Sequence, residues 1–229
     1  MPSILLTHGY FLNDDPRELE IMKPYSPLGI LYISAYLEEH GFGNDVFDST
    51  FSSFEDLCVE LKRKSPLVLG IYTNLMTKLN VLRLIRFVRE QEDLKHTRII
   101  LGGPEVKNHA ENFLKFGADV LVVGEGEETM LELVRYYSDV TNEKAEEKSF
   151  LSQVPGIAFL SAAHLVVTTP PRSLLKDIDQ LPFPNRKKIK LEKYFDAWKS
   201  RHGESAISMS TMRGCPYTCK WCSRAVYGQ

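Results

Sequence analysis

The sequence lacks the features that identify membrane, secreted and fibrous proteins. None of its apolar runs approaches the ~18 residues of a membrane span, and the longest candidate, residues 157–167, is interrupted by Ser161 and His164. The start of the chain has neither the basic region nor the cleavage site of a secretory signal. The 229 residues are 43% hydrophobic and 25% charged, as in ordinary globular proteins. We therefore expect no membrane span and a cytoplasmic location.

The chain also lacks a large excess of charge of either sign, because 28 Lys and Arg nearly balance 30 Asp and Glu and leave a net charge of −2. The balance hides an asymmetry, since ten basic residues face three acidic ones from Phe183 onward. The net charge is therefore +7 in that segment and −9 before it. Such a contrast favours two units with different roles. No nucleic-acid-binding motif is present, so the basic run at residues 186–190 is interpreted as a solvated face and no nucleic-acid partner is expected.

Residues 1–140 alternate between short β-rich runs and helical periods. Ser26 with Pro27 indicates the start of the first helix, and Ser52 with Glu55 has the spacing of a capping box for the second. A β-α unit repeated five times predicts an α/β fold with a doubly wound, five-stranded parallel sheet. The strands are expected at residues 4–8, 45–48, 67–73, 98–101 and 119–123.

The character of the chain changes after this first domain, and we divide the rest into a hairpin and linker at 141–200 and a third unit from 201 to 229. Residues 141–148 are polar and are expected to form an exposed loop, followed by a small β-hairpin. Four prolines then favour an extended connector. The expected elements are hairpin strands at 156–160 and 165–169, a short helix at 191–199 and a further strand at 205–213.

Three of the four cysteines, Cys215, Cys219 and Cys222, are spaced C-x3-C-x2-C. Closely spaced thiols in a cytosolic chain more often bind metal than form disulfides, and soft thiolates suit zinc or an iron–sulfur cluster. A structural zinc site takes four protein ligands, whereas three thiolates fit a cubane cluster with one open iron. The spacing favours the cluster and leaves zinc open. Cys58 lies at helical spacing with apolar residues, which predicts a buried, inert thiol.

The segment MRGCPYTCKWC, residues 212–222, resembles the signature of the radical S-adenosylmethionine (SAM) enzymes. The resemblance implies that Cys215, Cys219 and Cys222 hold a [4Fe–4S] cluster whose open iron binds SAM, and that an electron from the cluster cleaves SAM to a 5′-deoxyadenosyl radical. It places Trp221 near the bound SAM, and core packing is the alternative for this residue. It also implies a small-molecule substrate and a reductant protein such as a flavodoxin or ferredoxin.

A second resemblance lies at the ends of the predicted strands, where open parallel sheets bind their ligands. The sequence PLGILY at 27–32, the TNL and GG motifs, and VVGEGE at 122–127 together resemble the cobalamin (B12)-binding domain that precedes the barrel of many radical SAM enzymes. The resemblance implies a flavodoxin-like, cobalamin-binding Rossmann fold, followed by the first strand and cluster loop of a truncated βα barrel. It implies that the cobalamin-binding residues are Thr73, Asn74, Leu75, Gly102, Gly103, Gly124, Glu125 and Gly126.

By the same resemblance, the Thr73 hydroxyl and the space over Gly102 and Gly103 serve the nucleotide tail of cobalamin, while the strand-end loops support the corrin. The Asp-x-His-x-x-Gly motif that supplies a cobalt ligand in methionine-synthase-like proteins does not follow the first strand. His40 stands in a similar pattern, but at the end of a predicted helix and hence at the opposite edge of the sheet. His8 is at the correct edge without the motif. We therefore expect base-off cobalamin with no histidine ligand.

Together these patterns predict the N-terminal part of a cobalamin-dependent radical SAM enzyme that transfers methyl groups or rearranges and closes rings. Because the sequence stops seven residues after Cys222, we expect a fragment that binds cobalamin, holds the cluster weakly and does not turn over alone. The alternative is a non-catalytic flavodoxin-like binding or sensing module whose C-terminal thiolates hold zinc. A nucleotide- or flavin-binding sheet is disfavoured, because no G-x-G-x-x-G follows the first strand.

Overall fold

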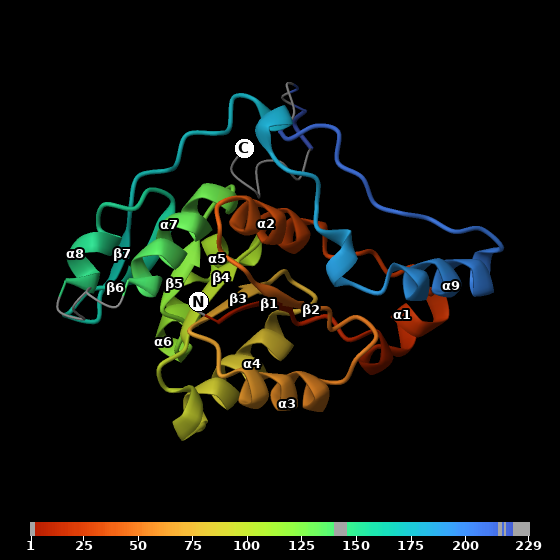
Figure 1. Cartoon of the computed structure of the whole chain (residues 1–229), viewed down its shortest axis with the longest axis horizontal. Helices are drawn as coiled ribbons and strands as arrows, with labels where there is room; N and C mark the ends of the chain where they lie inside the picture. The colour runs from red at the N-terminus through yellow and green to blue at the C-terminus, as the bar shows by residue number, and fades with distance from the viewer. Residues whose placement is uncertain (1–2, 140–145, 215–216, 218, 222–229) are drawn as a thin grey trace.

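The computed structural model describes residues 3–139, 146–214, 217 and 219–221, and one mixed β-sheet forms its centre (Figure 1). The strand order in the described residues is β2-β1-β3-β4-β5-β6-β7. The first five strands are parallel and the last two are antiparallel. The strands are β1 (Ile4–His8), β2 (Asp45–Phe47), β3 (Val68–Tyr72), β4 (Arg98–Gly102), β5 (Val120–Val122), β6 (Ile157–Leu160) and β7 (Val166–Thr168).

This topology confirms the predicted α/β fold, the five parallel strands and the hairpin. The structure adds that the hairpin is not separate, because β6 pairs with β5 and so extends the same sheet. Each predicted strand agrees with the observed one to within one residue at either end, apart from one further strand discussed below. Buried runs of apolar residues bounded by turn residues explain this agreement.

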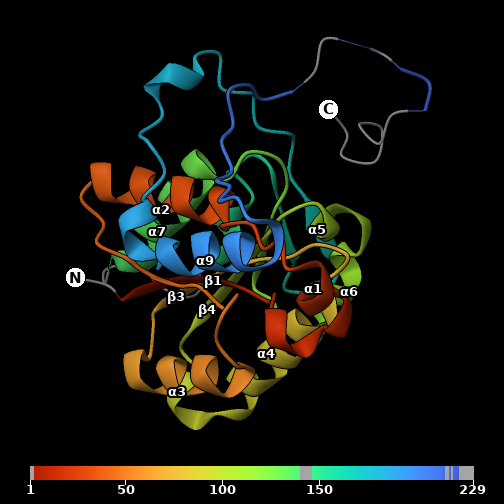
Figure 2. The ribbon, with the colours of Figure 1, turned by 90° about the vertical axis from the view of Figure 1, so that its right-hand side faces the viewer.

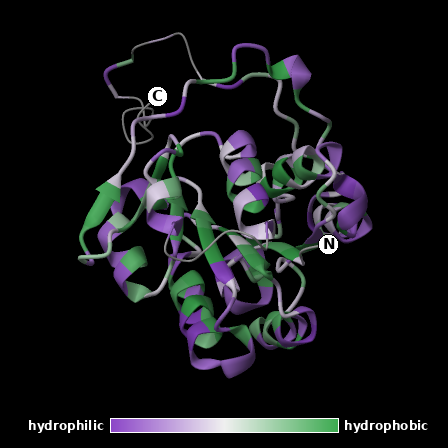
Figure 3. Cartoon of the chain, turned by 60° about the vertical axis from the view of Figure 1, so that its left-hand side comes forward, coloured by the Kyte–Doolittle hydropathy of each residue, from purple (hydrophilic) through white to green (hydrophobic). Residues whose placement is uncertain are grey.

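Helices cover both faces of the sheet (Figure 1). Along β1, Ile4 and Leu6 belong to the core on one face and Leu5 to the core on the other, as the period of two in a strand requires. Figure 3 shows the apolar residues gathered along the strands. The face of Leu5 is covered by α3 (Phe54–Lys64), α4 (Lys78–Glu90), α5 (Glu105–Asn108) and α6 (Ala110–Phe116). The face of Ile4 is covered by α2 (Leu28–Glu39), α7 (Glu127–Ser138) and α8 (Glu147–Leu151).

Two predicted helix starts are corrected by the structure. Pro27 occupies the N-cap of α2, and the Ser26 hydroxyl is buried without a hydrogen-bond partner among the described residues, so Ser26 does not cap the helix. The capping box of α3 is formed by Ser53 and Asp56, one residue after the expected pair. The Ser53 hydroxyl accepts from the Asp56 amide at 3.0 Å, while the Ser52 hydroxyl donates to a backbone carbonyl in the preceding turn.

The segments after the hairpin differ more from expectation. The predicted loop at 141–148 lies partly outside the described residues, and its last two residues begin α8. The structure places no strand at residues 205–213, all of which it describes. A strand needs a neighbouring strand with which to exchange backbone hydrogen bonds. This segment pairs with no strand in the described part of the chain, so the predicted strand at 205–213 is wrong. The predicted division into units at 140 and 200 stays a prediction.

The helix after the linker, α9 (Leu191–His202), lies beside α1 (Pro16–Ile21), as Figures 1 and 2 both show. Arg201 and His202 hydrogen-bond to backbone carbonyls of α1, and Lys188 forms an ion pair with Glu38 of α2. Part of the basic segment therefore packs on the acidic N-terminal domain instead of forming only a solvated face. None of the helices in residues 3–139 and 146–214 has the length and apolar character needed to cross a bilayer.

Candidate functional site

The carboxyl ends of β1 and β3 form the point where the strand order reverses, since β1 lies between β2 and β3. In open α/β sheets this crevice is the usual ligand site. Two adjoining cavities open there, one of about 430 Å³, the inner cavity, and one of about 720 Å³, the outer cavity. They share four lining residues from the start of α2 and the end of β3, which are Leu28, Gly29, Ile30 and Tyr72.

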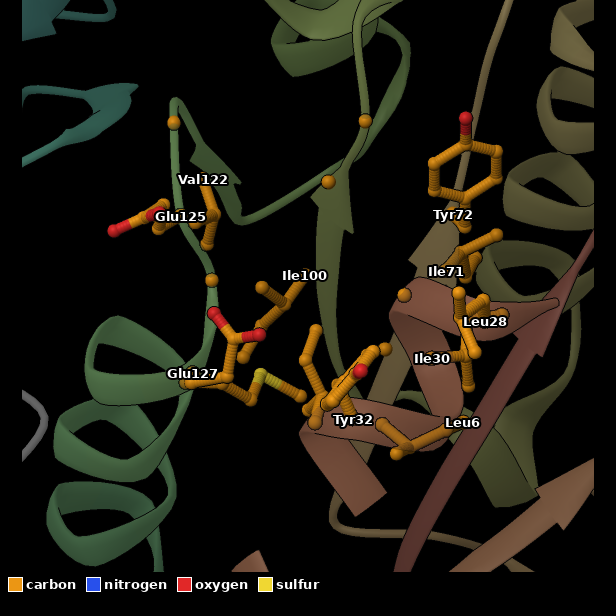
Figure 4. Close-up of a pocket in the computed structure, with 18 of the residues that line it drawn as sticks. Leu6, Leu28, Ile30, Tyr32, Ile71, Tyr72, Ile100, Val122, Glu125 and Glu127 are labelled. Atoms are coloured by element: carbon orange, nitrogen blue, oxygen red, sulfur yellow. The ribbon is translucent and has the colours of Figure 1, made fainter. Parts of the chain in front are cut away.

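The inner cavity has an apolar floor between α2 and α7, and Figure 4 shows the glycine-rich loop after β5 on one side of it and α2 with β3 on the other. Its volume is within the range of small-molecule sites. Its floor is formed by side chains and backbone of the central strands and α7, namely Leu6, Gly70, Ile100, Val122 and Met130.

Glycine is required at two positions beside this cavity. Gly70 faces the floor, where a Cβ atom would lie 2.7 Å from Leu6 and 2.8 Å from Met130. Gly103 has a φ of +106°, and a Cβ there would collide with the carbonyl oxygen of Thr73. Gly102 differs, because a Cβ atom would meet nothing within 4 Å and would extend into open space. A side chain at Gly102 would therefore occupy room that a ligand could use.

The residues of the TNL motif do not act as one group. Thr73 is fully buried and lines neither cavity, and its hydroxyl has no hydrogen-bond partner among the described residues. Such a group is rare in folded proteins and calls for an explanation. Asn74 lines the outer cavity, but its side-chain oxygen accepts from the amides of Met76 and Thr77 and so shapes the local turn. Leu75 is exposed and lines neither cavity.

The glycine-rich loop after β5 forms the acidic wall of the inner cavity. Gly124, Glu125 and Gly126 line the cavity, as the sequence predicts from their place after a strand. Glu127, the first residue of α7, lines it as well, and the prediction omitted it. Arg213 lies across this wall, 3.1 Å from Glu127 and 3.5 Å from Glu125, and its hydrogen bond to Glu127 raises its pKa above the ordinary value.

Sequence reasoning missed further lining residues. Tyr32 lines the inner cavity beneath the guanidinium of Arg213, which is 5.4 Å from the ring centroid. The place of Tyr32 within PLGILY was a signal for it. Nothing in the local sequence placed Arg213 or Ser210 there, because each is more than 80 residues from the glycine-rich loop.

His8 lines the outer cavity, but both of its ring nitrogens are used. Nδ1 accepts from the Tyr10 amide at 3.2 Å, which leaves the proton on Nε2, and Nε2 donates to Asp48 at 3.1 Å. Asp48 also accepts from Tyr194. Burial alone would raise the pKa of Asp48, but the hydrogen bonds from His8 and Tyr194 hold it below the ordinary value. His40 lies at the end of α2, where Nδ1 donates to the Tyr36 carbonyl.

The predicted cluster ligands are only partly within the described chain. Cys219 is an exposed free thiol, while Cys215 and Cys222 lie outside the described residues. Within the described ranges no three His, Cys, Asp or Glu side chains gather closely enough to hold a metal ion, so the cluster stays a prediction. Trp221 is 91% exposed, which contradicts core packing. Cys58 is half-buried, and burial raises its pKa to about 11, consistent with an inert thiol.

Comparison with known proteins agrees with this geometry. The family model described as the B12 binding domain matches residues 19–134, which is just over half of the chain. An uncharacterised methyltransferase of Pyrococcus horikoshii is 26% identical over 87% of this chain and 41% of its own length. The anaerobic magnesium-protoporphyrin IX monomethyl ester cyclase of Synechocystis is 27% identical over 86% of this chain and 38% of its own length. The chain thus spans about two fifths of the curated relatives it matches.

Among solved structures, the chain is similar to the cobalamin-dependent S-adenosylmethionine radical enzyme OxsB with aqua-cobalamin and S-adenosylmethionine bound. The TM-score is 0.73 at 20% identity, and the match covers 97% of this chain and 28% of that one. At this identity the likeness establishes the fold, including the hairpin that extends the parallel sheet.

Proposed function

This chain belongs to the B12-binding domain family and resembles the N-terminal part of cobalamin-dependent radical SAM enzymes, and from this we propose that it holds cobalamin at the carboxyl edge of its sheet. The observation that carries the proposal is the inner cavity, an apolar slot over bare backbone at the point where the strand order reverses.

The residues present fit the nucleotide tail of cobalamin in the inner cavity. The apolar floor suits a flat heteroaromatic base, and Gly102 leaves open space where any other residue would place a side chain. The Thr73 carbonyl oxygen lies against the bare backbone of Gly103, and the buried, unpaired Thr73 hydroxyl, although it lines neither cavity, is our candidate hydrogen-bonding group for the tail. Gly124, Glu125 and Gly126 would form the opposite wall. In this assignment the Thr73 hydroxyl would gain the hydrogen-bond partner that it lacks among the described residues.

The corrin would lie over the outer cavity, where Asn74 shapes the turn after β3 and Met76 presents an exposed apolar side chain. Bound cobalamin would supply a methyl group in methylating enzymes of this kind. The chain's own residues orient the ring and exclude water beneath it. Because Asp48 and Tyr10 use both nitrogens of His8, we assign no histidine to the cobalt.

The cluster and SAM belong to the same proposal at a finer level. Cys215, Cys219 and Cys222 would hold a [4Fe–4S] cluster, and exposed Trp221 would lie near SAM. Since the relatives are much longer than this chain, we assign methyl transfer or ring closure, the small-molecule substrate and the reductant protein to the whole enzyme. The described residues alone are proposed to bind cobalamin without turnover.

Equilibrium binding of hydroxocobalamin to the purified chain tests the proposal. Gly102→Val should place its side chain in the inner cavity, where a Cβ atom meets nothing within 4 Å, and weaken binding about tenfold or more, a loss of ~1.4 kcal/mol. Gly43→Val is the matched control, since Gly43 also has open space around it but lines neither cavity. Failure of the native chain to bind, or equal binding by both variants, would contradict the proposal.

A further inference from the structure

Arg213 connects the segment that leads to the cysteines with the acidic wall of the inner cavity. After α9, residues 203–214 form no helix or strand, yet Ser210, Arg213 and Gly214 line that cavity. We call residues 205–214 the strap. Cys215 follows it directly in the sequence.

Arg213 contacts one buried carboxylate, Glu127, and one partly buried carboxylate, Glu125. Its Nη2 lies 2.5 Å and its Nη1 3.1 Å from the two oxygens of Glu127, whose side chain is only 5% exposed. Nη1 also lies 3.5 Å from Glu125, which accepts a second hydrogen bond from the Leu175 amide. The guanidinium covers the ring of Tyr32 at the same time. Three side chains, those of Glu127, Glu125 and Tyr32, therefore contact this one guanidinium.

The negative charges of Glu125 and Glu127 on the cavity wall are balanced by the contacts with Arg213. Glu125 and Glu127 lie two residues apart on the cavity wall, and a buried carboxylate without a partner is strongly unfavourable. In the described part of the chain, Arg213 is the cation paired with Glu127. Without it, the wall would also repel an anionic ligand group such as a phosphodiester. A guanidinium has five N–H donors, so Arg213 can pair with both carboxylates and still face such a group.

We propose that Arg213 is a positioning residue that couples cobalamin binding to the docking of the strap. With the strap docked, the acidic wall is neutralised and the inner cavity gains its last lining residues. A ligand that fills the cavity therefore favours the docked strap, and by linkage the docked strap raises the affinity for the ligand by the same factor. Arg213, two residues before Cys215 in the sequence, is held at the cavity as a result. This inference rests on the proposed function.

Hydrogen exchange of strap peptides, measured with and without hydroxocobalamin, tests the coupling. In the native chain, saturating hydroxocobalamin should slow exchange in the strap about fivefold or more. In Arg213→Gln this slowing should be lost, and the dissociation constant should rise about tenfold. Arg213→Lys keeps the charge but loses the two-pronged geometry, and it should retain more affinity than Arg213→Gln. Arg201→Gln, on α9 and remote from the cavity, should behave as the native chain does.

A double variant separates neutralisation of the wall from docking of the strap. Arg213→Gln combined with Glu127→Gln removes the buried charge together with its partner, so affinity should recover most of its loss while the strap stays unprotected. If Arg213→Gln binds hydroxocobalamin as tightly as the native chain and its strap is equally slowed, the inference is wrong and the proposed function stands.

If instead the native chain binds no cobalamin, the proposed function fails. Hydrogen exchange of the ligand-free proteins then tests whether Arg213 docks the strap. Faster strap exchange in ligand-free Arg213→Gln than in the native chain would support docking by Arg213, and equal exchange would overturn it. Far-ultraviolet circular dichroism of each variant shows whether the fold is kept, and Arg213→Lys supplies a second test should Arg213→Gln fold poorly.

Discussion

His8 Nε2 lies 3.1 Å from Asp48 Oδ1, and this contact joins the first strand to the loop after β2 at the edge where the outer cavity opens. The network continues to α9, because the Tyr194 hydroxyl lies 2.8 Å from Asp48 and 2.8 Å from Thr50. Burial next to the Asp48 carboxylate raises the pKa of Tyr194 far above its ordinary value. A residue from the linker region thus holds the carboxylate that in turn holds His8.

Bound cobalamin should therefore be base-off with no protein nitrogen on cobalt. Electron paramagnetic resonance of the cobalt(II) form bound to the chain should show no nitrogen hyperfine splitting, and His8→Ala should leave the spectrum unchanged. Free cobalt(II) cobalamin at neutral pH, with its own base attached, serves as the reference. Nitrogen splitting in the native complex that disappears in His8→Ala would refute the assignment.

The same network predicts how stability depends on pH. The folded-state pKa of Asp48 is below the ordinary value of 3.8, so its contribution is present above that pH and is lost as the pH falls through the folded pKa. Asp48→Asn should cost about 1.5–3 kcal/mol at pH 7, as expected for hydrogen bonds to a charged group. The variant should also lose less stability than the native chain as the pH falls below 3.8. Urea unfolding across this range measures both effects. Asp14→Asn, in an exposed turn, is the control.

Thr73→Val should separate ligand binding from stability. The Thr73 hydroxyl is buried and unpaired, so an isosteric methyl should leave the free energy of unfolding of the ligand-free protein unchanged or raise it by about 1–3 kcal/mol. Loss of the proposed hydrogen bond should weaken hydroxocobalamin binding about fivefold, or ~1 kcal/mol. Thr97→Val is the contrast, because its hydroxyl donates to the Pro66 carbonyl at 2.7 Å and its loss should destabilise the protein without changing affinity. Unchanged binding by Thr73→Val would count against a role for this hydroxyl.

The assignment of the nucleotide tail to the inner cavity predicts a ligand-dependent effect of filling that cavity. Cobinamide keeps the corrin but lacks the nucleotide tail. Gly102→Val should therefore weaken cobalamin binding about tenfold and leave cobinamide binding within about twofold of native. Titration of both ligands against the native chain and the variant measures the difference. Equal losses for the two ligands would show that the tail lies elsewhere.

The thiolates predict iron chemistry over zinc. Anaerobic reconstitution with iron and sulfide should incorporate both into the chain, and Cys219→Ser should reduce incorporation because one of three thiolates is removed. Cys58→Ser should not, since this half-buried thiol has a raised pKa. Analysis of iron, sulfide and zinc in the same samples measures the outcome. Stoichiometric zinc without sulfide would support the alternative of a binding or sensing module.

Local pattern was sufficient for most of the fold. β1 spans Ile4–His8 as predicted, because a short buried strand shows as an apolar run whatever lies far along the chain. Gly102, Gly103 and the loop at 124–126 line the inner cavity because parallel strands bring their carboxyl ends to one edge. The capping box was predicted one residue too early, at Ser52 instead of Ser53. Neighbouring serines have similar local sequence, and only the packed helix shows which of them is the N-cap.

The sequence by itself therefore determined the strands, most of the helices and the edge of the sheet where the cavities open, since these follow from short-range periodicity and turn chemistry. Only the tertiary structure decided that β6 extends the sheet, that Asp48, held by Tyr194, hydrogen-bonds to His8, and that Arg213 neutralises Glu127. These contacts join residues far apart in the chain. They depend on burial and on the pairing of buried charges, which exist only once the chain has folded.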